Sequence, residues 1–456
     1  MTENTFDVVI VGGGSGGYAC ALRSAQLGMS VAIIEQDRTG GTCLHNGCIP
    51  TKALLHAAEV ADTVRDSTSF GVTASLTGID MAQVNTYKAG VIDRLHKGLN
   101  GLIASAGITV IDGRGKLVSE KTVEVDGHCI TGKYLVLATG ALARTLPGLT
   151  IEGRVMTSEQ ALNLPDIPET VVIIGGSVIG VEFASLWRSL GADVTVIESM
   201  GSLVPQEDPS ISKKLERAFR KRKIKVKANA KVIGVEQTQE TATVTLADGQ
   251  TLNADVVLVA VGREPRTTGL GLDELGVQLH RGWVATNERL RTTVPGIYAV
   301  GDLVEGFQLA HRGFAHGIFV AEDIAGLSPD PIEDSKIPKV TYCDPEVASV
   351  GLTEAEAAEK FGEVDTVEYN LGGNGKSQIL GTGGAVKLVR QRGGSIVGVH
   401  MIGSRISEQV GEAAMAVHLG TTPEDYAQLI HAHPTQNESL GEAAMALAGK
   451  PLHSHS

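Results

Sequence analysis

The chain has 456 residues, and 39 Lys and Arg against 52 Asp and Glu residues give it a net charge of −13. At about 150 residues per domain, this length predicts roughly three domains, each large enough to bury a core. Hydrophobic residues make up 42% and charged residues 20% of the chain, a balance that argues against intrinsic disorder. The negative charge disfavours a general nucleic-acid binder, because neutralising phosphates needs an excess of Lys and Arg.

The N-terminal sequence MTENTFD lacks the cationic stretch and apolar core of a signal peptide. No uninterrupted apolar run approaches the roughly 18 residues that a transmembrane helix needs. We therefore expect a soluble, cytoplasmic protein. In a reducing compartment five cysteines do not predict a set of structural disulfides, so a close pair among them is expected to be catalytic or metal-binding.

An internal repeat organises the first half of the chain. Residues 7–35 and 170–198 each contain a buried strand, a Gly-rich turn, an amphipathic helix and a second strand that ends on Glu. In both copies the first Gly lies 23 positions before that acid: Gly12 before Glu35, and Gly175 before Glu198. This unit is the fingerprint of a dinucleotide site, in which the glycines admit a pyrophosphate and the acid binds ribose. Two copies at equal spacing predict two bound dinucleotides.

Later segments complete this organisation. The segment 292–303 is expected to be a strand that returns to the first sheet. From about Ser335 onward, strands such as KVTYC and GAVKLVR alternate with predicted helices at 353–361, 405–419 and 436–448. We expect an α/β fold with two Rossmann-like dinucleotide-binding domains and a C-terminal α+β domain. The predicted boundaries are 1–145 for the first domain, 146–270 for the second, 271–334 for the return to the first, and 335–456 for the last.

A cysteine pair follows the first dinucleotide unit directly, in the sequence GGTCLHNGCIPTK of residues 40–52. In a regular helix, Cα atoms five residues apart are separated by about 8.7 Å, whereas a disulfide needs about 4.4–6.8 Å. If Cys43 and Cys48 pair, the backbone between them cannot be regular helix, and Gly47 supplies the freedom to bend it.

Three interpretations of these cysteines compete. A zinc site would need two further Cys or His ligands at short spacing, and no second pair exists. Inert core cysteines are the default for isolated residues, and we expect them at Cys20, Cys129 and Cys343. A redox-active dithiol beside a dinucleotide site explains the placement of Cys43 and Cys48, and we favour it.

The Gly-rich start, the CLHNGCIPTK segment, the second fingerprint and a late HPTxxE motif together resemble the two-cysteine flavin disulfide reductases, most closely the dihydrolipoyl dehydrogenases. The resemblance covers essentially the whole chain. It implies that the first unit binds FAD and the second a nicotinamide dinucleotide. It also implies a redox-active Cys43–Cys48 disulfide and a C-terminal domain that forms a homodimer.

The resemblance assigns individual residues as well. It implies that Glu438 orients His433, which acts as a base toward the substrate thiol at the cysteine pair of the other subunit. It further implies an ion pair between Lys52 and Glu182. The implied cofactor contacts are Gly12, Gly14, Gly17, Glu35, Thr42, Lys52, Gly115, Thr139, Gly140, Asp302 and Ala310, and, in the second unit, Gly175, Gly180, Glu182, Glu198, Val232 and Gly262.

Some of these residues also have simple local explanations. Thr435 and Glu438 have the spacing of a capping box at the start of a helix, and Asp302 could form a turn after a strand. The capping box and the family role compete for one carboxylate, and we favour the family role. The His433–Pro434 bond is a candidate cis peptide bond.

The chain departs from the family pattern at a few positions, none of which removes a catalytic group: Thr39, His45, Asn46, His316 and Cys343. The second fingerprint also carries Ser177 where a middle Gly is usual, and a small side chain there should still admit a pyrophosphate. No Lys or Arg occurs in residues 199–204, where a 2′-phosphate would need a cation. The second site is therefore expected to prefer NAD over NADP.

The implied function is FAD-dependent oxidation of protein-bound dihydrolipoyl groups to lipoyl disulfide, with reduction of NAD to NADH, as a component of 2-oxo acid dehydrogenase complexes. The implied partner is the lipoyl domain of a 2-oxo acid dehydrogenase acyltransferase or the glycine cleavage carrier protein. Two alternatives stay open: a flavin reductase for another thiol or disulfide, and a flavin-bearing binding subunit with little turnover. We expect no metal, nucleic acid or membrane partner.

Overall fold

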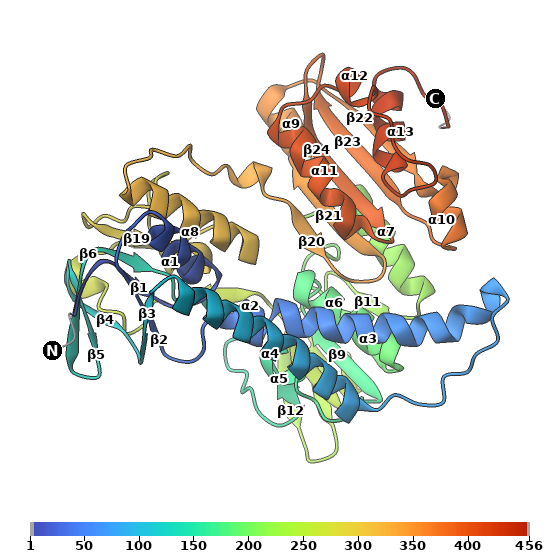
Figure 1. Ribbon diagram of the computed structural model, residues 1–456. Coiled ribbons are helices and arrows are strands. Elements are labelled where there is room, and N and C mark those ends of the chain that lie inside the picture. The colour runs from blue at the N-terminus through green and yellow to red at the C-terminus, as the bar shows by residue number, and fades with distance from the viewer. Residues whose placement is uncertain (1–3, 454–456) are drawn as a thin grey trace. The chain divides into compact units, whose positions relative to one another are not determined.

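The computed structural model describes residues 4–453 of the chain (Figure 1). Two compact units divide the chain, and each is built from three segments that are distant in sequence. Unit 1 contains residues up to Leu54, Ala82–Arg144 and Arg263–Asp334. Unit 2 contains Leu55–Met81, Thr145–Gly262 and the residues from Ser335 onward.

Unit 1 is built on a mixed, mainly parallel sheet with the order β3-β2-β1-β6-β5-β4. The strand β19 adds to it by pairing in parallel with the last residues of β6, Ala299 opposite Leu137. The chain thus returns to the first sheet at β19, and Asp302 lies in the short 3₁₀ turn that follows. The strands are β1 (Thr5–Val11), β2 (Val31–Glu35), β3 (Thr109–Asp112), β4 (Lys116–Ser119), β5 (Thr122–Val125), β6 (His128–Leu137) and β19 (Ile297–Ala299).

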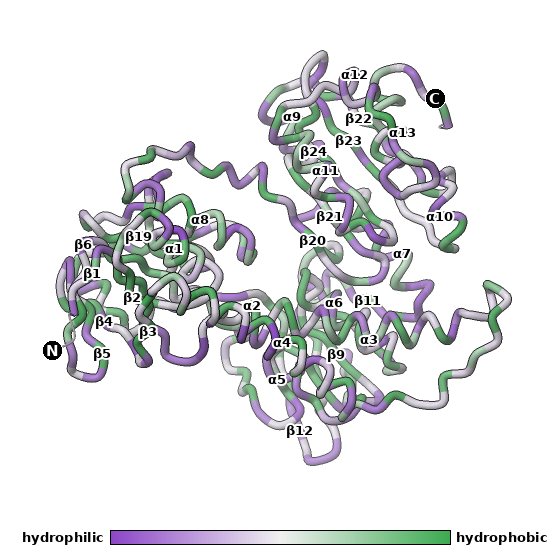
Figure 2. Tube along the Cα trace, in the orientation of Figure 1, coloured by the Kyte–Doolittle hydropathy of each residue, from purple (hydrophilic) through white to green (hydrophobic). Residues whose placement is uncertain are grey.

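Helices α1 (Ser15–Gln26) and α8 (Ala310–Ile324) pack closely on this sheet. A Cβ atom at Gly317 would lie 2.3 Å from the carbonyl oxygen of Gly16, so the two helices meet backbone to backbone. Buried aliphatic residues of the sheet and of both helices form one core cluster with Cys20, as expected for that cysteine. Figure 2 shows green, hydrophobic stretches along these central strands. Cys129 lies exposed on β6, so the prediction of a core position is wrong for that residue.

Unit 2 repeats the same plan in a five-stranded parallel sheet with the order β11-β10-β9-β15-β8. In unit 2, α6 connects β9 to β10 and α7 connects β10 to β11. The three helices α2, α3 and α4 lie between β2 and β3 of unit 1. The three helices account for the extra length after the first fingerprint. The elements are β8 (Val155–Met156), α5 (Ser158–Ala161), β9 (Thr170–Ile174), α6 (Val178–Leu190), β10 (Asp193–Ile197), α7 (Pro209–Lys221), β11 (Lys225–Lys227), β15 (Val256–Val259), and the antiparallel β12 (Val232–Gln237), β13 (Ala242–Leu246) and β14 (Thr251–Ala254).

The last third of the chain forms an antiparallel sheet in the order β20-β21-β24-β23-β22. Helices α9, α11 and α13 match the three predicted helices to within two residues at each end. Together with the mainly parallel sheet of unit 1 and the parallel sheet of unit 2, this antiparallel sheet confirms the predicted α/β class. The elements are β20 (Lys339–Thr341), β21 (Glu346–Gly351), α9 (Glu354–Phe361), β22 (Val364–Asn370), α10 (Gly375–Ile379), β23 (Ala385–Gln391), β24 (Ile396–Gly403), α11 (Ile406–His418), α12 (Pro423–Tyr426) and α13 (Glu438–Leu447).

The chain returns from unit 2 to unit 1 at Arg263, earlier than the boundary at residue 270 that the sequence suggested. Strand β16 (Arg263–Pro265) pairs with β7 (Ala141–Ala143) in unit 1. This pairing gives residues 263–270 to unit 1, whereas the prediction counted them with the second dinucleotide domain. Within residues 4–453, no helix is long and apolar enough to cross a membrane.

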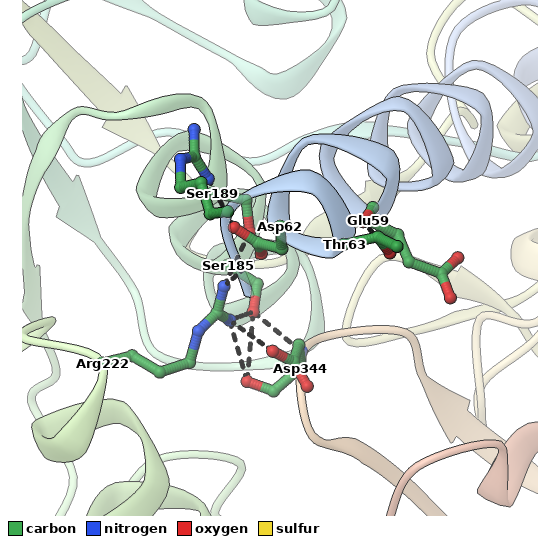
Figure 3. A network of polar contacts seen from close by, with 8 residues as sticks. Glu59, Asp62, Thr63, Ser185, Ser189, Arg222 and Asp344 are labelled. Carbon is green, nitrogen blue, oxygen red and sulfur yellow. Dashed lines mark hydrogen bonds and ion pairs between the residues drawn. The ribbon is translucent and has the colours of Figure 1, made fainter. Parts of the chain in front are cut away.

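One guanidinium group holds four segments of unit 2 together (Figure 3). Arg222 donates hydrogen bonds to Ser185 Oγ at 2.8 Å and Ser189 Oγ at 2.6 Å on α6. It also donates to the Asp344 carbonyl oxygen at 2.9 Å and forms an ion pair with Asp62 on α3 at 3.2 Å. Bonds to charged groups are among the stronger hydrogen bonds in proteins, so this contact is a major tie within unit 2.

We predict that Arg222→Met lowers the free energy of unfolding of unit 2 by about 2–3 kcal/mol, because Asp62, Ser189 Oγ and the Asp344 carbonyl oxygen each lose a charged donor. A urea titration followed by the fluorescence of the buried Trp187 on α6 reports this change. Arg220→Met is the matched control, because Arg220 is exposed, and it should shift the free energy by less than about 0.5 kcal/mol. Equal midpoints for the two variants would contradict the assignment.

Candidate active site and dinucleotide sites

The first Gly-rich turn requires glycine at two positions for packing. Gly12 has φ +107°, and a Cβ there would lie 2.3 Å from the Ala138 carbonyl oxygen. A Cβ at Gly17 would lie 1.9 Å from the Gly12 carbonyl oxygen. At Gly14, by contrast, the nearest heavy atom to a Cβ is 3.9 Å away. Gly12 and Gly17 therefore allow the strand, turn and helix to pack, while Gly14 borders open space that a pyrophosphate can enter.

The acid at the end of β2 is held against this turn. One Glu35 oxygen accepts a hydrogen bond from the Gly13 N–H at 2.6 Å, and the other accepts one from the Asp37 N–H at 2.9 Å. Each carboxylate oxygen has two lone pairs, so both can still accept a bond from a ribose hydroxyl. The turn and the acid thus form one rigid unit at the carboxyl ends of the strands, where α/β sheets bind their ligands.

The second turn reproduces this arrangement bond for bond. A Cβ at Gly175 would lie 2.3 Å from the Ala260 carbonyl oxygen, and one at Gly180 would lie 1.9 Å from the Gly175 carbonyl oxygen. Glu198 accepts from the Gly176 N–H at 2.7 Å and from the Met200 N–H at 2.6 Å. Ser177 is the N-cap residue of α6, the place that Gly14 has before α1.

The remaining predicted cofactor residues of unit 1 lie around the same strand ends. Thr139 follows β6 beside Gly12, and its hydroxyl donates to the Arg266 carbonyl oxygen at 2.8 Å. Burial raises the pKa of Asp302, which follows β19, although Arg263 and Arg312 oppose this shift. Three other predicted positions are Gly115, packed on Val11 and Ile34 of the sheet, Gly140, with φ +71°, and Ala310, the first residue of α8.

In unit 2 the predicted contacts also gather near the second turn. The Ala230 N–H, two residues before Val232, donates to the Glu198 carbonyl oxygen at 2.9 Å. Gly262 follows β15 with φ +108°. Glu182 is buried on α6 and accepts a hydrogen bond from the Tyr342 N–H at 2.9 Å. Its ion pair with Lys52 stays a prediction.

The two cysteines lie on separate helices, as the bend predicted between them requires. Cys43 is in α2 (Gly41–His45) and Cys48 begins α3 (Cys48–Asp66). At the break, a Cβ on Gly47 would lie 2.9 Å from the Thr42 carbonyl oxygen, so glycine allows the chain to close on α2.

Cys43 and Cys48 are both partly buried, and a hydrogen bond joins their side chains. This hydrogen bond, burial and the neighbouring charge of Cys48 raise the pKa of Cys43, whereas the cation of Lys52 acts to lower it.

Tyr18 is a neighbour of the cysteine pair that the sequence analysis missed. Burial, and then the charges of Cys43 and Cys48, raise the pKa of Tyr18 to about 12. Its ring also contacts the ring of Phe314, with centroids 5.6 Å apart. The only signal in the sequence is that Tyr18 follows Gly17 directly, which places it on the first turn of α1.

His433 and Glu438 form the predicted pair, with His433 Nδ1 2.7 Å from Glu438 Oε1. The other carboxylate oxygen of Glu438 accepts from the Thr435 N–H at 2.7 Å. The expectation that the two contacts exclude each other is therefore wrong, because each uses its own oxygen. The capping box is also wrong, since α13 begins at Glu438 and its N-cap is Asn437. The His433–Pro434 bond is cis, as predicted.

The His433 side chain is 77% exposed, whereas Glu438 is 21% exposed. An imidazole whose Nδ1 is bonded to a carboxylate presents Nε2 outward, a geometry suited to accepting a proton from a substrate. Within the described residues, no group of three His, Cys, Asp or Glu side chains could hold a metal ion.

Comparisons with known proteins agree with this architecture. Residues 6–317 match the family described as pyridine nucleotide-disulphide oxidoreductase, and residues 337–444 match the dimerisation domain of that family. Dihydrolipoyl dehydrogenase of Bacillus subtilis is 39% identical over 98% of this chain and 99% of its own length. The mitochondrial dihydrolipoyl dehydrogenase of Pisum sativum is 38% identical over 98% of this chain and 92% of its own length.

Solved structures of similar proteins superpose along nearly the whole chain. LpdA of Mycobacterium tuberculosis has a TM-score of 0.91 at 28% identity, over 96% of this chain and 99% of its own. The HOCl-induced flavoprotein disulfide reductase RclA of Escherichia coli, as a Cu(II) complex, has a TM-score of 0.88 at 26% identity, over 97% of this chain and 99% of its own.

We predict that Gly14→Val removes the first dinucleotide without unfolding the protein. The backbone at Gly14 is extended, with φ −73°, so valine fits, but its branched side chain occupies the space open to the pyrophosphate. The flavin retained per chain after gel filtration should fall by about tenfold or more, a loss of at least about 1.4 kcal/mol in binding.

Gly98→Val is the control for this variant. Gly98 is exposed in α4 (Met81–Ser105), and nothing lies within 4 Å of a Cβ there. It should retain as much flavin as the unmodified chain. Full flavin content in Gly14→Val would show that the pyrophosphate does not approach this position.

Proposed function

Because the chain belongs to the pyridine nucleotide-disulphide oxidoreductase family, we propose that it is a dihydrolipoyl dehydrogenase. In this proposal it oxidises protein-bound dihydrolipoyl groups to lipoyl disulfide, with FAD as the bound cofactor and NAD as the final acceptor. Relatives carrying that name match the chain over nearly its full length, which supports the assignment.

The observation that carries the proposal is the dithiol beside the first dinucleotide turn. Cys43 and Cys48 are joined by a hydrogen bond, and the helix that bears Cys43 begins against this turn. A Cβ at Gly41, the first residue of α2, would lie 2.7 Å from Gly14 Cα. A pair of thiols this close to a flavin site is suited to passing an electron pair to the flavin.

The residues of both turns fit the two dinucleotides. Glycines that allow close packing, an open position before the helix and a fixed ribose-binding acid occur together in each copy. When bound there, FAD would supply a two-electron carrier between the dithiol and NAD. Glu198 and the absence of cations from residues 199–204 support NAD over NADP, since a carboxylate repels a 2′-phosphate.

The chemical steps assigned to this chain are thiol–disulfide exchanges. His433 takes the proton of one substrate thiol, and the resulting thiolate attacks Cys43 in the oxidised pair. A substrate–Cys43 disulfide forms, and Cys48 leaves as the thiolate. The second substrate thiol then attacks the substrate sulfur of that bond, which releases oxidised lipoyl and the thiol of Cys43. One dithiol is oxidised as the other is reduced, and Glu438 holds His433 in the orientation for proton transfer.

The proposal includes a homodimer in which His433 serves the cysteine pair of the other subunit, supported by the match to a dimerisation domain. It also includes a partner that brings the lipoyl group: the acyltransferase of a 2-oxo acid dehydrogenase or the carrier protein of glycine cleavage. The cytoplasmic location stays a prediction.

The test of the substrate is a side-by-side measurement of initial rates for four pairs: dihydrolipoamide or glutathione as thiol, each with NAD or NADP. We expect dihydrolipoamide with NAD to exceed each other pair by about 100-fold or more, a difference of at least about 2.7 kcal/mol in the barrier. Preference for glutathione would favour a reductase of another thiol, and uniformly negligible rates would favour a binding subunit.

We predict that Cys48→Ser abolishes dihydrolipoamide turnover while FAD stays bound, because the electron pair can no longer leave through a dithiol. His433→Ala should slow dihydrolipoamide oxidation by about 10³-fold and leave NADH-to-dye electron transfer within about twofold, since only the first reaction needs the base.

Cys129→Ser, an exposed position on β6, is the control for the cysteine change and should keep full activity. Turnover in Cys48→Ser would refute the dithiol route. Equal losses of both activities in His433→Ala would refute its role as the base.

A further inference from the structure

The segment that carries His433 is short and mostly exposed, so side chains from other elements must hold its backbone in place. His433 lies between Ala432 and a cis proline, and its imidazole is bonded to Glu438. Glu438 also accepts from the Thr435 N–H, and the Thr435 carbonyl oxygen accepts from Asn374 Nδ2 at 2.9 Å, so part of the backbone after His433 is held there as well. A proton acceptor must lie within about 3 Å of the thiol it serves, so the backbone on both sides of His433 needs an anchor.

A single carboxylate from another helix bonds this segment on both sides of His433. Glu412 lies on α11 (Ile406–His418), and its Oε1 is 2.8 Å from His431 Nε2, two residues before His433. Its Oε2 accepts a hydrogen bond from Asn437 Nδ2 at 2.5 Å, four residues after His433. The Tyr426 hydroxyl donates a third bond to Oε1 at 2.5 Å.

Packing restricts His431 further. Its ring stacks on Tyr426, with centroids 6.1 Å apart, and its side chain is only 12% exposed. A Cβ at Gly441 would lie 2.7 Å from His431 Nδ1, so the imidazole lies directly against the backbone of α13. His431 is therefore fixed between the Glu412 carboxylate and the helix that begins with Glu438.

The charge state of this contact makes it strong. Although burial opposes ionisation, hydrogen bonds from His431, Tyr426 and Asn437 lower the pKa of Glu412 to about 2. The hydrogen bond to Glu412 raises the pKa of His431. The Glu412 carboxylate is therefore charged, and a hydrogen bond to a charged acceptor is stronger than one between neutral groups.

We infer that Glu412 is a positioning residue for His433: by holding His431 and Asn437, it fixes the loop that presents the base to the substrate thiol. The inference rests on the proposed function. Glu412 does not touch the reacting atoms and acts through the backbone on both sides of the base. Because a misplacement of about 1 Å can reduce a rate by about 100-fold, the loss of this anchor should be visible in the thiol reaction.

Glu412→Gln is the test variant, because it keeps the volume of the side chain. An amide presents an NH₂ group where Glu412 presents an oxygen, so it cannot accept bonds from both His431 and Asn437. We expect kcat for dihydrolipoamide oxidation to fall by about 10- to 100-fold while NADH-to-dye electron transfer stays within about twofold. Glu424→Gln, in the exposed ion pair with Arg390 at 2.8 Å, is the matched control and should leave both rates unchanged.

A double-mutant cycle separates positioning of the base from general damage. In the His433→Ala background, Glu412→Gln should cause no further loss, because there is no base left to position. A loss that persists in that background, or an equal loss of dye reduction, would show a merely structural role. A Glu412→Gln variant as fast as the unmodified chain would overturn the inference outright.

A second measurement, the rate of thiol alkylation, tests the positioning role of Glu412 without a lipoyl substrate. Alkylation of Cys43 by iodoacetamide in the dithiothreitol-reduced protein, measured with Cys129→Ser because Cys129 is exposed, uses the thiolate and its proton acceptor but no lipoyl substrate. Glu412→Gln and His433→Ala should slow this alkylation alike, and the double variant no further. If the unmodified protein does not oxidise dihydrolipoamide, the proposed function fails. If the alkylation rate of Glu412→Gln equals that of the unmodified protein, the positioning role is overturned.

Discussion

Two thiols five residues apart can meet only where a helix stops and restarts, and the chemistry of this protein depends on that interruption. The chain leaves α2 at His45, turns through Asn46 and Gly47, and enters α3 at Cys48. The turn is tight enough that any side chain at Gly47 would press on the Thr42 carbonyl oxygen. Because α2 itself begins against Gly14, the same few residues connect the sulfur chemistry to the flavin site.

The rest of the molecule keeps this small region in place. Backbone contacts between α1 and α8 support the turn from one side, and the sheet supports it from the other. His433, which we propose as the base, lies in the C-terminal domain, where Glu438 bonds its imidazole and Glu412 bonds His431 and Asn437 on either side of it. Rigid elements thus hold each reacting group, as catalysis by proximity demands.

Features governed by local rules could be predicted from the sequence. The two strand–turn–helix units were predictable because Gly12 and Gly175 occupy positions where only glycine fits. The break between the cysteines followed from the length of a helical turn. Contacts that depend on the meeting of distant segments were not predictable: no sequence pattern marks Tyr18 as a neighbour of the cysteines, or Glu412 as the support of a loop some twenty residues later.

The errors have physical causes as well. The capping-box pattern at Thr435 was misleading because residues 435–437 precede α13, which begins at Glu438. The Glu438 carboxylate bonds the Thr435 N–H, but Thr435 is not the N-cap of the helix. Cys129 was assigned to the core because most isolated cysteines are buried, yet its place on β6 faces solvent. The crossing at Arg263 was missed because a three-residue pairing with β7 leaves no periodic signal.

The residue before the helix differs between the two matched turns, Gly14 in the first and Ser177 in the second. Gly14 leaves the backbone bare toward its ligand, whereas Ser177 adds a side chain at the same place. A closer approach favours slow dissociation, which suits a prosthetic group that remains through many cycles. The looser fit favours rapid exchange, which suits a carrier that must depart after every turnover. The hydroxymethyl group of Ser177 is thus the feature at this position that distinguishes the site of the exchanging nucleotide from that of the bound prosthetic group.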